Sequence, residues 1–179
     1  METTKFEIES AKSRIDWIGK KVTGAHNGTI DVKEGTLLVT DGKLSGGTIV
    51  IDTASIKILD IADADTNAQF AGHLASDDFF AIEKFPTATF VITSVKGLSA
   101  NQYHLEGNLT IKGITHTAGL DAAIETNAGA LTLAGKLIVD RTKYDIKFRS
   151  GNFFKDLGDT LIYNDFELDT HLTAFQSKN

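Results

Sequence analysis

The residues of this chain best suited to catalysis or metal binding are its five histidines. They are His26, His73, His104, His116 and His171. No two of them stand two or four residues apart, the spacing that places two metal ligands on one face of a strand or a helix. The chain contains no cysteine, which excludes thiolate nucleophiles, zinc fingers and iron–sulfur clusters. We therefore predict no metal and no cofactor.

Three motif-like segments fail on inspection. The segment 63–67 begins like a calcium loop, but Ala68 replaces the glycine of the sharp turn and Leu74 replaces the bidentate glutamate. The segment 35–43 resembles a phosphate loop, yet it is two residues too long, and Leu44 replaces the Ser or Thr that binds magnesium. No Gly-x-Ser-x-Gly nucleophile elbow occurs. The sequence therefore favours a protein without catalytic activity.

Composition and charge restrict the possible partners. The net charge is −6 and the pI is about 5.3, whereas proteins that bind nucleic acids concentrate Lys and Arg on one face. No run of about 20 apolar residues is present to span a membrane, and Met1–Lys5 lacks the apolar core of a signal peptide. We expect no nucleic-acid partner. The chain as written is expected in the cytoplasm, or in the periplasm if it is a processed or truncated form.

The segment from His73 to Phe90 is unusually rich in aromatic residues. It contains Phe79, Phe80, Phe85, Phe90 and the only proline of the chain, Pro86. Aromatic rings gathered between a helical segment and a strand are typical of the mouth of an apolar cavity. This segment therefore indicates ligand binding. A second aromatic concentration between Tyr144 and Tyr163 includes Phe148, Phe153 and Phe154.

Alternation of apolar and polar residues predicts strands over much of the chain. In 103–112, Tyr103, Leu105 and Leu109 share one face while polar residues occupy the other. The segment 165–174 repeats the pattern, with Phe166 and Leu168 on the apolar face. Hairpin turns are predicted at Asp41-Gly42 and at 127–129. Eight to nine strands at this spacing favour a closed barrel or a sandwich, and periodicity does not separate the two.

One helix is predicted within this β protein. Thr66 can cap its first turn with Gln69 completing a capping box, and Phe70 and Leu74 form a narrow apolar stripe. Pro86 ends the helical region, because the residue before a proline is driven into an extended conformation.

Three polar residues, in different parts of the chain, are candidates for contacts at the mouth of a cavity. Arg141 can form a structural ion pair with Asp140 or Asp145, or it can receive an anionic head group at a cavity mouth. His73 can point at the cavity rim and bind a head group. His116 is either a hydrogen-bonded residue at a strand end or a polar contact at the mouth.

The chain resembles the YceI-like family of bacterial proteins over nearly its whole length. The matching pieces are Trp17 with 19–24, His26 with 28–30, 73–90, 107–116 and 140–142. One departure is Ala118, where the family pattern has proline. The resemblance implies an extended lipocalin-like barrel that holds a long isoprenoid or similar amphiphile, no catalytic activity, and a homodimer.

We therefore predict a single domain over residues 1–179, an all-β, extended eight-stranded antiparallel barrel with a short helical insertion around residues 66–84. It is expected to bind, store or transport a polyisoprenoid, quinone or fatty-acid-like lipid. The expected ligand-binding residues are Trp17, Phe70, His73, Phe79, Phe80, Phe90, Leu109, Ile111, Arg141, Phe166 and Leu168. Two alternatives stay open: an enzyme using a histidine and a carboxylate on a lipid-like substrate, and an interaction module whose core is filled.

Overall fold

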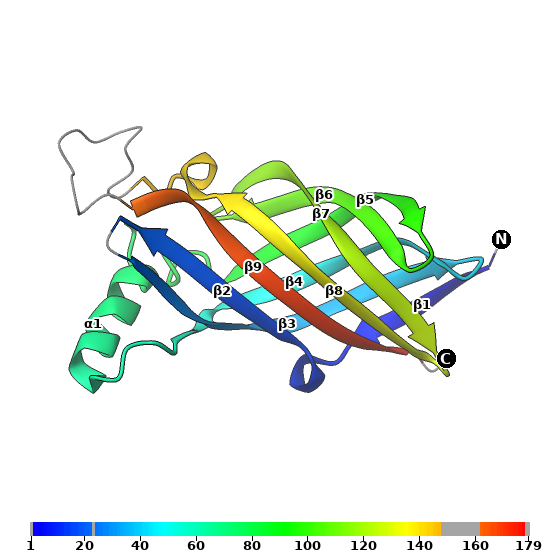
Figure 1. Cartoon of the computed structure of the whole chain (residues 1–179), viewed down its shortest axis with the longest axis horizontal. Helices are drawn as coiled ribbons and strands as arrows, with labels where there is room; N and C mark the ends of the chain where they lie inside the picture. The colour runs from blue at the N-terminus through cyan, green and yellow to red at the C-terminus, as the bar shows by residue number, and fades with distance from the viewer. Residues whose placement is uncertain (1, 23, 148–161, 178–179) are drawn as a thin grey trace.

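The computed structural model describes residues 2–22, 24–147 and 162–177, and they form an antiparallel β-barrel with one α-helix (Figure 1). The strands are β1 (Thr3–Ile8), β2 (Arg14–Lys21), β3 (Gly24–Thr40), β4 (Lys43–Ile58), β5 (Thr87–Ser99), β6 (Gln102–Ile111), β7 (Ile114–Asn127), β8 (Ala130–Asp140) and β9 (Ile162–Gln176). The helical elements are α1 (Ala64–Ala75) and two 3-10 turns, η1 (Ser10–Lys12) and η2 (Arg141–Tyr144).

The barrel closes with eight strand positions, as predicted. Each strand from β2 to β8 pairs with the next strand in sequence, and β9 pairs back with β2. Strand β1 pairs with the same two neighbours as β2, namely β3 and β9, but farther along them. The two short strands β1 and β2 therefore follow each other along one position, interrupted by η1. Closure leaves the eight-stranded part of the sheet without a free edge.

Tight turns set the register of the long hairpins. Asp41 and Gly42 have φ values of 53° and 79° between β3 and β4, and Ala128 and Gly129 have 51° and 81° between β7 and β8. Two consecutive residues with positive φ match the right-handed twist of the flanking strands. Both predicted hairpin turns are confirmed.

The predicted helix exists, but its start and its cap differ from the expectation. α1 begins at Ala64 and ends at Ala75. Its N-cap is Asp63, whose carboxylate accepts hydrogen bonds from the backbone N–H of Thr66 at 2.9 Å and from the Thr66 hydroxyl at 2.7 Å. Thr66 therefore lies inside the first turn, because the Asp63 carboxylate caps the helix three residues before the predicted cap. Residues 76–84 form turns instead of continuing the helix.

α1 and the turns that follow it lie at one end of the barrel, opposite the chain termini (Figure 1). The half of the barrel near the termini is filled by its own side chains. Its fully buried residues include Leu37, Leu105, Leu131, Leu133 and Leu172. The cavity described below lies at the opposite end, which α1 borders.

Candidate ligand-binding cavity

A cavity of about 640 Å³ lies inside the barrel at the end bordered by α1. Ten of the eleven residues predicted to bind a ligand line it. They are Trp17, Phe70, His73, Phe79, Phe80, Leu109, Ile111, Arg141, Phe166 and Leu168. Further apolar lining comes from Ile30, Ile51, Ile56, Ile61 and Leu74. The volume is within the range of about 300–1,000 Å³ that is typical of sites for small organic ligands.

Phe90 is the one predicted site residue that does not line this cavity. It is 4% exposed and packs elsewhere in the core, because Gly107 leaves room for its ring. A Cβ added at Gly107 would lie 2.8 Å from the Phe90 ring. Phe90 was predicted to line the cavity because it belongs to the aromatic-rich segment 73–90, and composition does not show which of these rings faces the cavity.

Trp17 forms part of the cavity wall through a tight three-part contact. Its indole N–H donates to the carbonyl oxygen of Lys57 at 3.1 Å. Gly28 lies opposite Trp17 in the β2–β3 pair. A Cβ added at Gly28 would be 1.7 Å from the Lys57 carbonyl oxygen and 2.7 Å from the indole ring. The indole therefore presents its apolar surface to the cavity, while its only polar group is bonded to the protein.

The helix and the turns after it supply aromatic rings to the mouth. The Phe80 ring meets the Phe166 ring of β9 edge-on, with centroids 6.2 Å apart. The His73 ring meets Phe79 edge-on at 4.9 Å. Thr53 of β4 holds this segment against the barrel by donating its hydroxyl to the carbonyl oxygen of Phe85 at 2.9 Å. The aromatic-rich segment thus borders the cavity, as its composition indicated.

Arg141 is buried and forms neither of the two ion pairs considered from the sequence. Its guanidinium donates to the carbonyl oxygens of Tyr163 (3.0 Å), Ile146 (2.8 Å) and Ile162 (3.0 Å). Burial lowers the pKa of Arg141 below its ordinary value, and the charge of Asp140 partly opposes this shift. These bonds connect η2 and the residues after it to the start of β9. The structure assigns Arg141 a clamping role, and a role in head-group binding stays a prediction.

The remaining histidines have distinct environments. His73 Nε2 lies 3.0 Å from an Asp78 oxygen. His116 is exposed and packs edge-on against Tyr144 with ring centroids 5.3 Å apart, which places it at a strand end outside the residues that line the cavity. In the part of the chain that the structure describes, no group of three His, Cys, Asp or Glu residues is arranged to hold a metal ion.

The YceI-like domain model matches residues 6–174. This chain belongs to the YceI-like family. Curated relatives include the UPF0312 protein YE1254 of Yersinia enterocolitica, 35% identical over 62% of this chain and 53% of that protein, and Protein YceI of Salmonella arizonae, 37% identical over 52% of this chain and 49% of that protein. The matched part spans about half the length of these relatives.

Solved structures have the same barrel fold. BcnA of Burkholderia cenocepacia superposes with a TM-score of 0.75 at 23% identity, covering 93% of this chain and 98% of BcnA. A polyisoprenoid binding domain from Saccharophagus degradans superposes with a TM-score of 0.67 at 13% identity, covering 98% and 100% of the two chains. At these identities the likeness establishes the fold. Among the described residues, no helix is long and apolar enough to cross a membrane.

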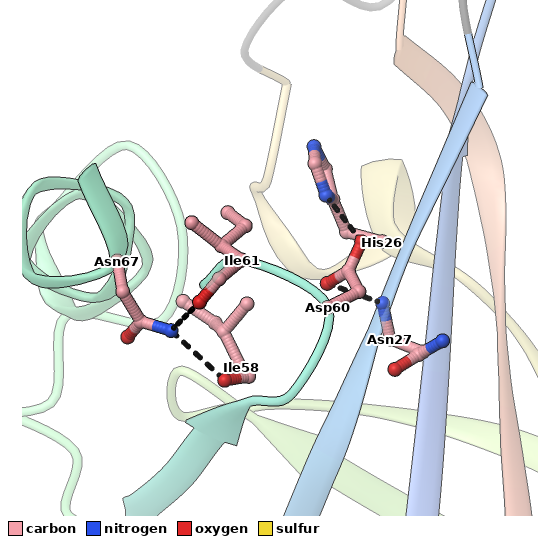
Figure 2. Close-up of polar contacts among 6 residues, drawn as sticks. All are labelled: His26, Asn27, Ile58, Asp60, Ile61 and Asn67. Carbon is pink, nitrogen blue, oxygen red and sulfur yellow. Dashed lines mark hydrogen bonds and ion pairs between the residues drawn. The ribbon is translucent and has the colours of Figure 1, made fainter. Parts of the chain in front are cut away.

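Sequence reasoning missed one polar feature of this YceI-like cavity, the pair formed by His26 and Asp60. His26 lines the cavity from β3, and its Nδ1 lies 2.9 Å from an Asp60 oxygen (Figure 2). The other Asp60 oxygen accepts the backbone N–H of Asn27 at 3.2 Å. Burial raises the pKa of Asp60, but the hydrogen bonds from His26 and Asn27 outweigh it and lower that pKa below its ordinary value. The two residues are 34 apart in sequence, so no local spacing could reveal the pair.

Proposed function

We propose that this YceI-like protein binds one long-chain amphiphile, such as a polyisoprenoid, a quinone or a fatty-acid-like lipid, and carries or stores it without chemical conversion. The apolar cavity beside α1 is the observation that carries the proposal. Each methylene moved from water into such a cavity contributes about 0.8 kcal/mol, so a hydrocarbon chain can bind tightly with few polar contacts. The Saccharophagus degradans neighbour, described as a polyisoprenoid binding domain, supports this ligand class.

The filled-core alternative conflicts with the observed hollow, because it requires side chains to occupy the whole interior. The enzymatic alternative requires a histidine within hydrogen-bond reach of a carboxylate at the cavity. Two pairs meet that requirement, His26 with Asp60 and His73 with Asp78. Within the described segments the His26 ring has no hydrogen bond to a Ser or Thr hydroxyl, the arrangement that would activate such a nucleophile. We therefore favour binding over turnover.

Trp17 offers a direct test, because it is the only tryptophan of the chain and lines the cavity. Titration with a C15 or C20 prenol is expected to change its fluorescence and to saturate at one ligand per chain in native mass spectrometry. Incubation should return the prenol unchanged by mass. Failure of both prenols and fatty acids to bind would contradict the proposal, and a product of new mass would favour the enzyme.

A pair of glycine variants places the ligand in the cavity. A Cβ added at cavity-lining Gly19 meets only Trp17, at 4.0 Å, so the Gly19→Leu side chain would extend into the hollow. We expect at least a tenfold loss of affinity. Gly97→Leu is the matched control, because Gly97 is exposed on β5 and an added Cβ meets nothing within 4 Å. Equal affinity of both variants would place the ligand outside the barrel.

We further propose that residues 1–179 form one domain and that the protein forms a homodimer. Limited proteolysis tests the first statement. Size-exclusion chromatography with light scattering tests the second, since a dimer and a monomer of 19.3 kDa are readily separated by mass.

A further inference from the structure

His26 is a half-buried polar residue of the cavity lining, which also includes the half-buried Lys21 and His73 and the exposed Lys20, Tyr163 and Asp165. The Trp17 N–H is bonded to Lys57 O, the Thr53 hydroxyl to Phe85 O, and the Thr66 hydroxyl to Asp63. Arg141 donates to three carbonyl oxygens. The His26 ring is bonded through Nδ1 only, and within the described residues its Nε2 has no hydrogen-bond partner. A half-buried imidazole nitrogen is thus left available to a ligand.

Asp60 determines which ring nitrogen of His26 carries the hydrogen. A carboxylate accepts hydrogen bonds, so Nδ1 is the donor to Asp60, and Nε2 of the neutral ring is left as an acceptor. The Asp60 carboxylate is held in turn by the backbone N–H of Asn27. Acceptor character at Nε2 is therefore a consequence of the Asp60 contact.

The linker that carries Asp60 is itself anchored to the helix. The Asn67 side chain of α1 donates to the carbonyl oxygens of Ile58 at 2.9 Å and Ile61 at 3.1 Å (Figure 2). Ile58 lies two residues before Asp60, and Ile61 lies one residue after it. The His26 ring also contacts Phe70 of α1, with centroids 4.9 Å apart. A polar group bound at Nε2 would consequently lie beside the aromatic mouth of the cavity, with its hydrocarbon chain directed into the barrel.

We propose that His26 Nε2 is the head-group acceptor of this cavity and that the ligand is a hydroxyl-headed amphiphile. The O–H of the ligand donates to Nε2, while Asp60 holds the ring in the tautomer that accepts. This inference rests on the proposed function, since it names the head group of the amphiphile bound in the same cavity. His26 is a specificity-determining residue, and affinity for the hydrocarbon chain comes from the apolar wall.

The test compares two ligands that differ only in the donor: a C20 prenol and its methyl ether. Binding is measured by Trp17 fluorescence at pH 8. We expect the prenol to bind about tenfold more tightly, the effect of one hydrogen bond that the ether cannot make. Failure of both probes to bind would overturn the proposed function together with this inference. Equal affinity for the two probes would overturn this inference alone.

Asp60→Asn separates hydrogen bonding from the added bulk of the methyl group. The Asn27 N–H continues to require a carbonyl oxygen, which places the new NH₂ group toward His26 Nδ1 and makes Nε2 a donor. Alcohol and ether oxygens both accept hydrogen bonds, so the tenfold preference should collapse to about one. A preference that persists in Asp60→Asn would be steric and would overturn the proposal.

Two further variants complete the design. His26→Phe removes the acceptor and should abolish the preference while prenol binding through the apolar wall remains. If this variant does not fold, the wild-type ratio and Asp60→Asn still decide the question. His104→Gln is the matched control, because His104 contacts Asp121 at 2.8 Å in the same manner but does not line the cavity. A loss of preference in His104→Gln would contradict a local role of His26.

Discussion

Gly28→Ala tests whether the Trp17 wall is as tightly packed as the structure shows. The added Cβ would lie 1.7 Å from the Lys57 carbonyl oxygen and 2.7 Å from two indole carbons. The indole N–H bond to that same oxygen, 3.1 Å long, would have to shift or break. Overpacking in a buried site costs about 1–3 kcal/mol, and a lost hydrogen bond costs about another 1 kcal/mol. We expect the free energy of unfolding to fall by about 2–4 kcal/mol.

Urea denaturation followed by circular dichroism measures this loss, with Trp17 fluorescence as a second probe of the same wall. Gly97→Ala is the control, because its new Cβ meets nothing within 4 Å, and we expect a change below about 0.5 kcal/mol. A Gly28→Ala protein within 0.5 kcal/mol of the parent would refute the close approach of β3, Trp17 and Lys57. It would also contradict the hydrogen bond from the Trp17 indole N–H to the Lys57 carbonyl oxygen.

Two other variants test the polar contacts. The Asp121 hydrogen bond raises the pKa of His104; desolvation opposes this shift, and the Glu106 hydrogen bond adds to it. The resulting stability is present below the ordinary imidazole pKa of about 6.5 and is lost as pH rises through the raised value. His104→Gln should therefore lower the melting temperature at pH 5.5 more than at pH 9, and equal losses at both would contradict the assignment. In Arg141→Lys the three N–H donors sit on a single nitrogen, which cannot reproduce the positions of Nε, Nη1 and Nη2 that reach the three carbonyl oxygens. We expect a loss of about 2–4 kcal/mol in urea denaturation, and an unchanged midpoint would mean that the clamp is dispensable.

Much of the fold could be predicted because its signals are local. The period-two pattern of 103–112 identified the buried face of β6, where Leu105 and Leu109 are both 1% exposed. Asp41-Gly42 located a hairpin, since the tolerance of both residues for positive φ is an intrinsic property. The helix was found but misplaced at its start, because Asp63 and Thr66 are both good capping residues and only the folded chain shows which one accepts the backbone N–H.

The sequence predicted most, but not all, of the residues on its list to line the cavity correctly. Apolar residues such as Leu109 and Phe166 could be placed on the inner face by alternation, and both line the cavity. Phe90 was predicted from the aromatic composition of 73–90 and lies in the core away from the cavity lining instead, because composition carries no information about position along the barrel axis. Phe148, Phe153 and Phe154 of the second aromatic concentration lie outside the described residues.

By itself, the sequence predicted a β protein of alternating strands and tight turns, with an aromatic-rich helical insertion and no cysteine chemistry. These properties follow from side-chain type and from spacing over a few residues. Tertiary structure alone decided where the cavity lies in the barrel. It also decided that the Arg141 guanidinium donates to backbone carbonyl oxygens and that His26 contacts Asp60. The physical reason is that hydrogen bonds and packing act over a few ångströms in space, between residues that the chain places tens of positions apart.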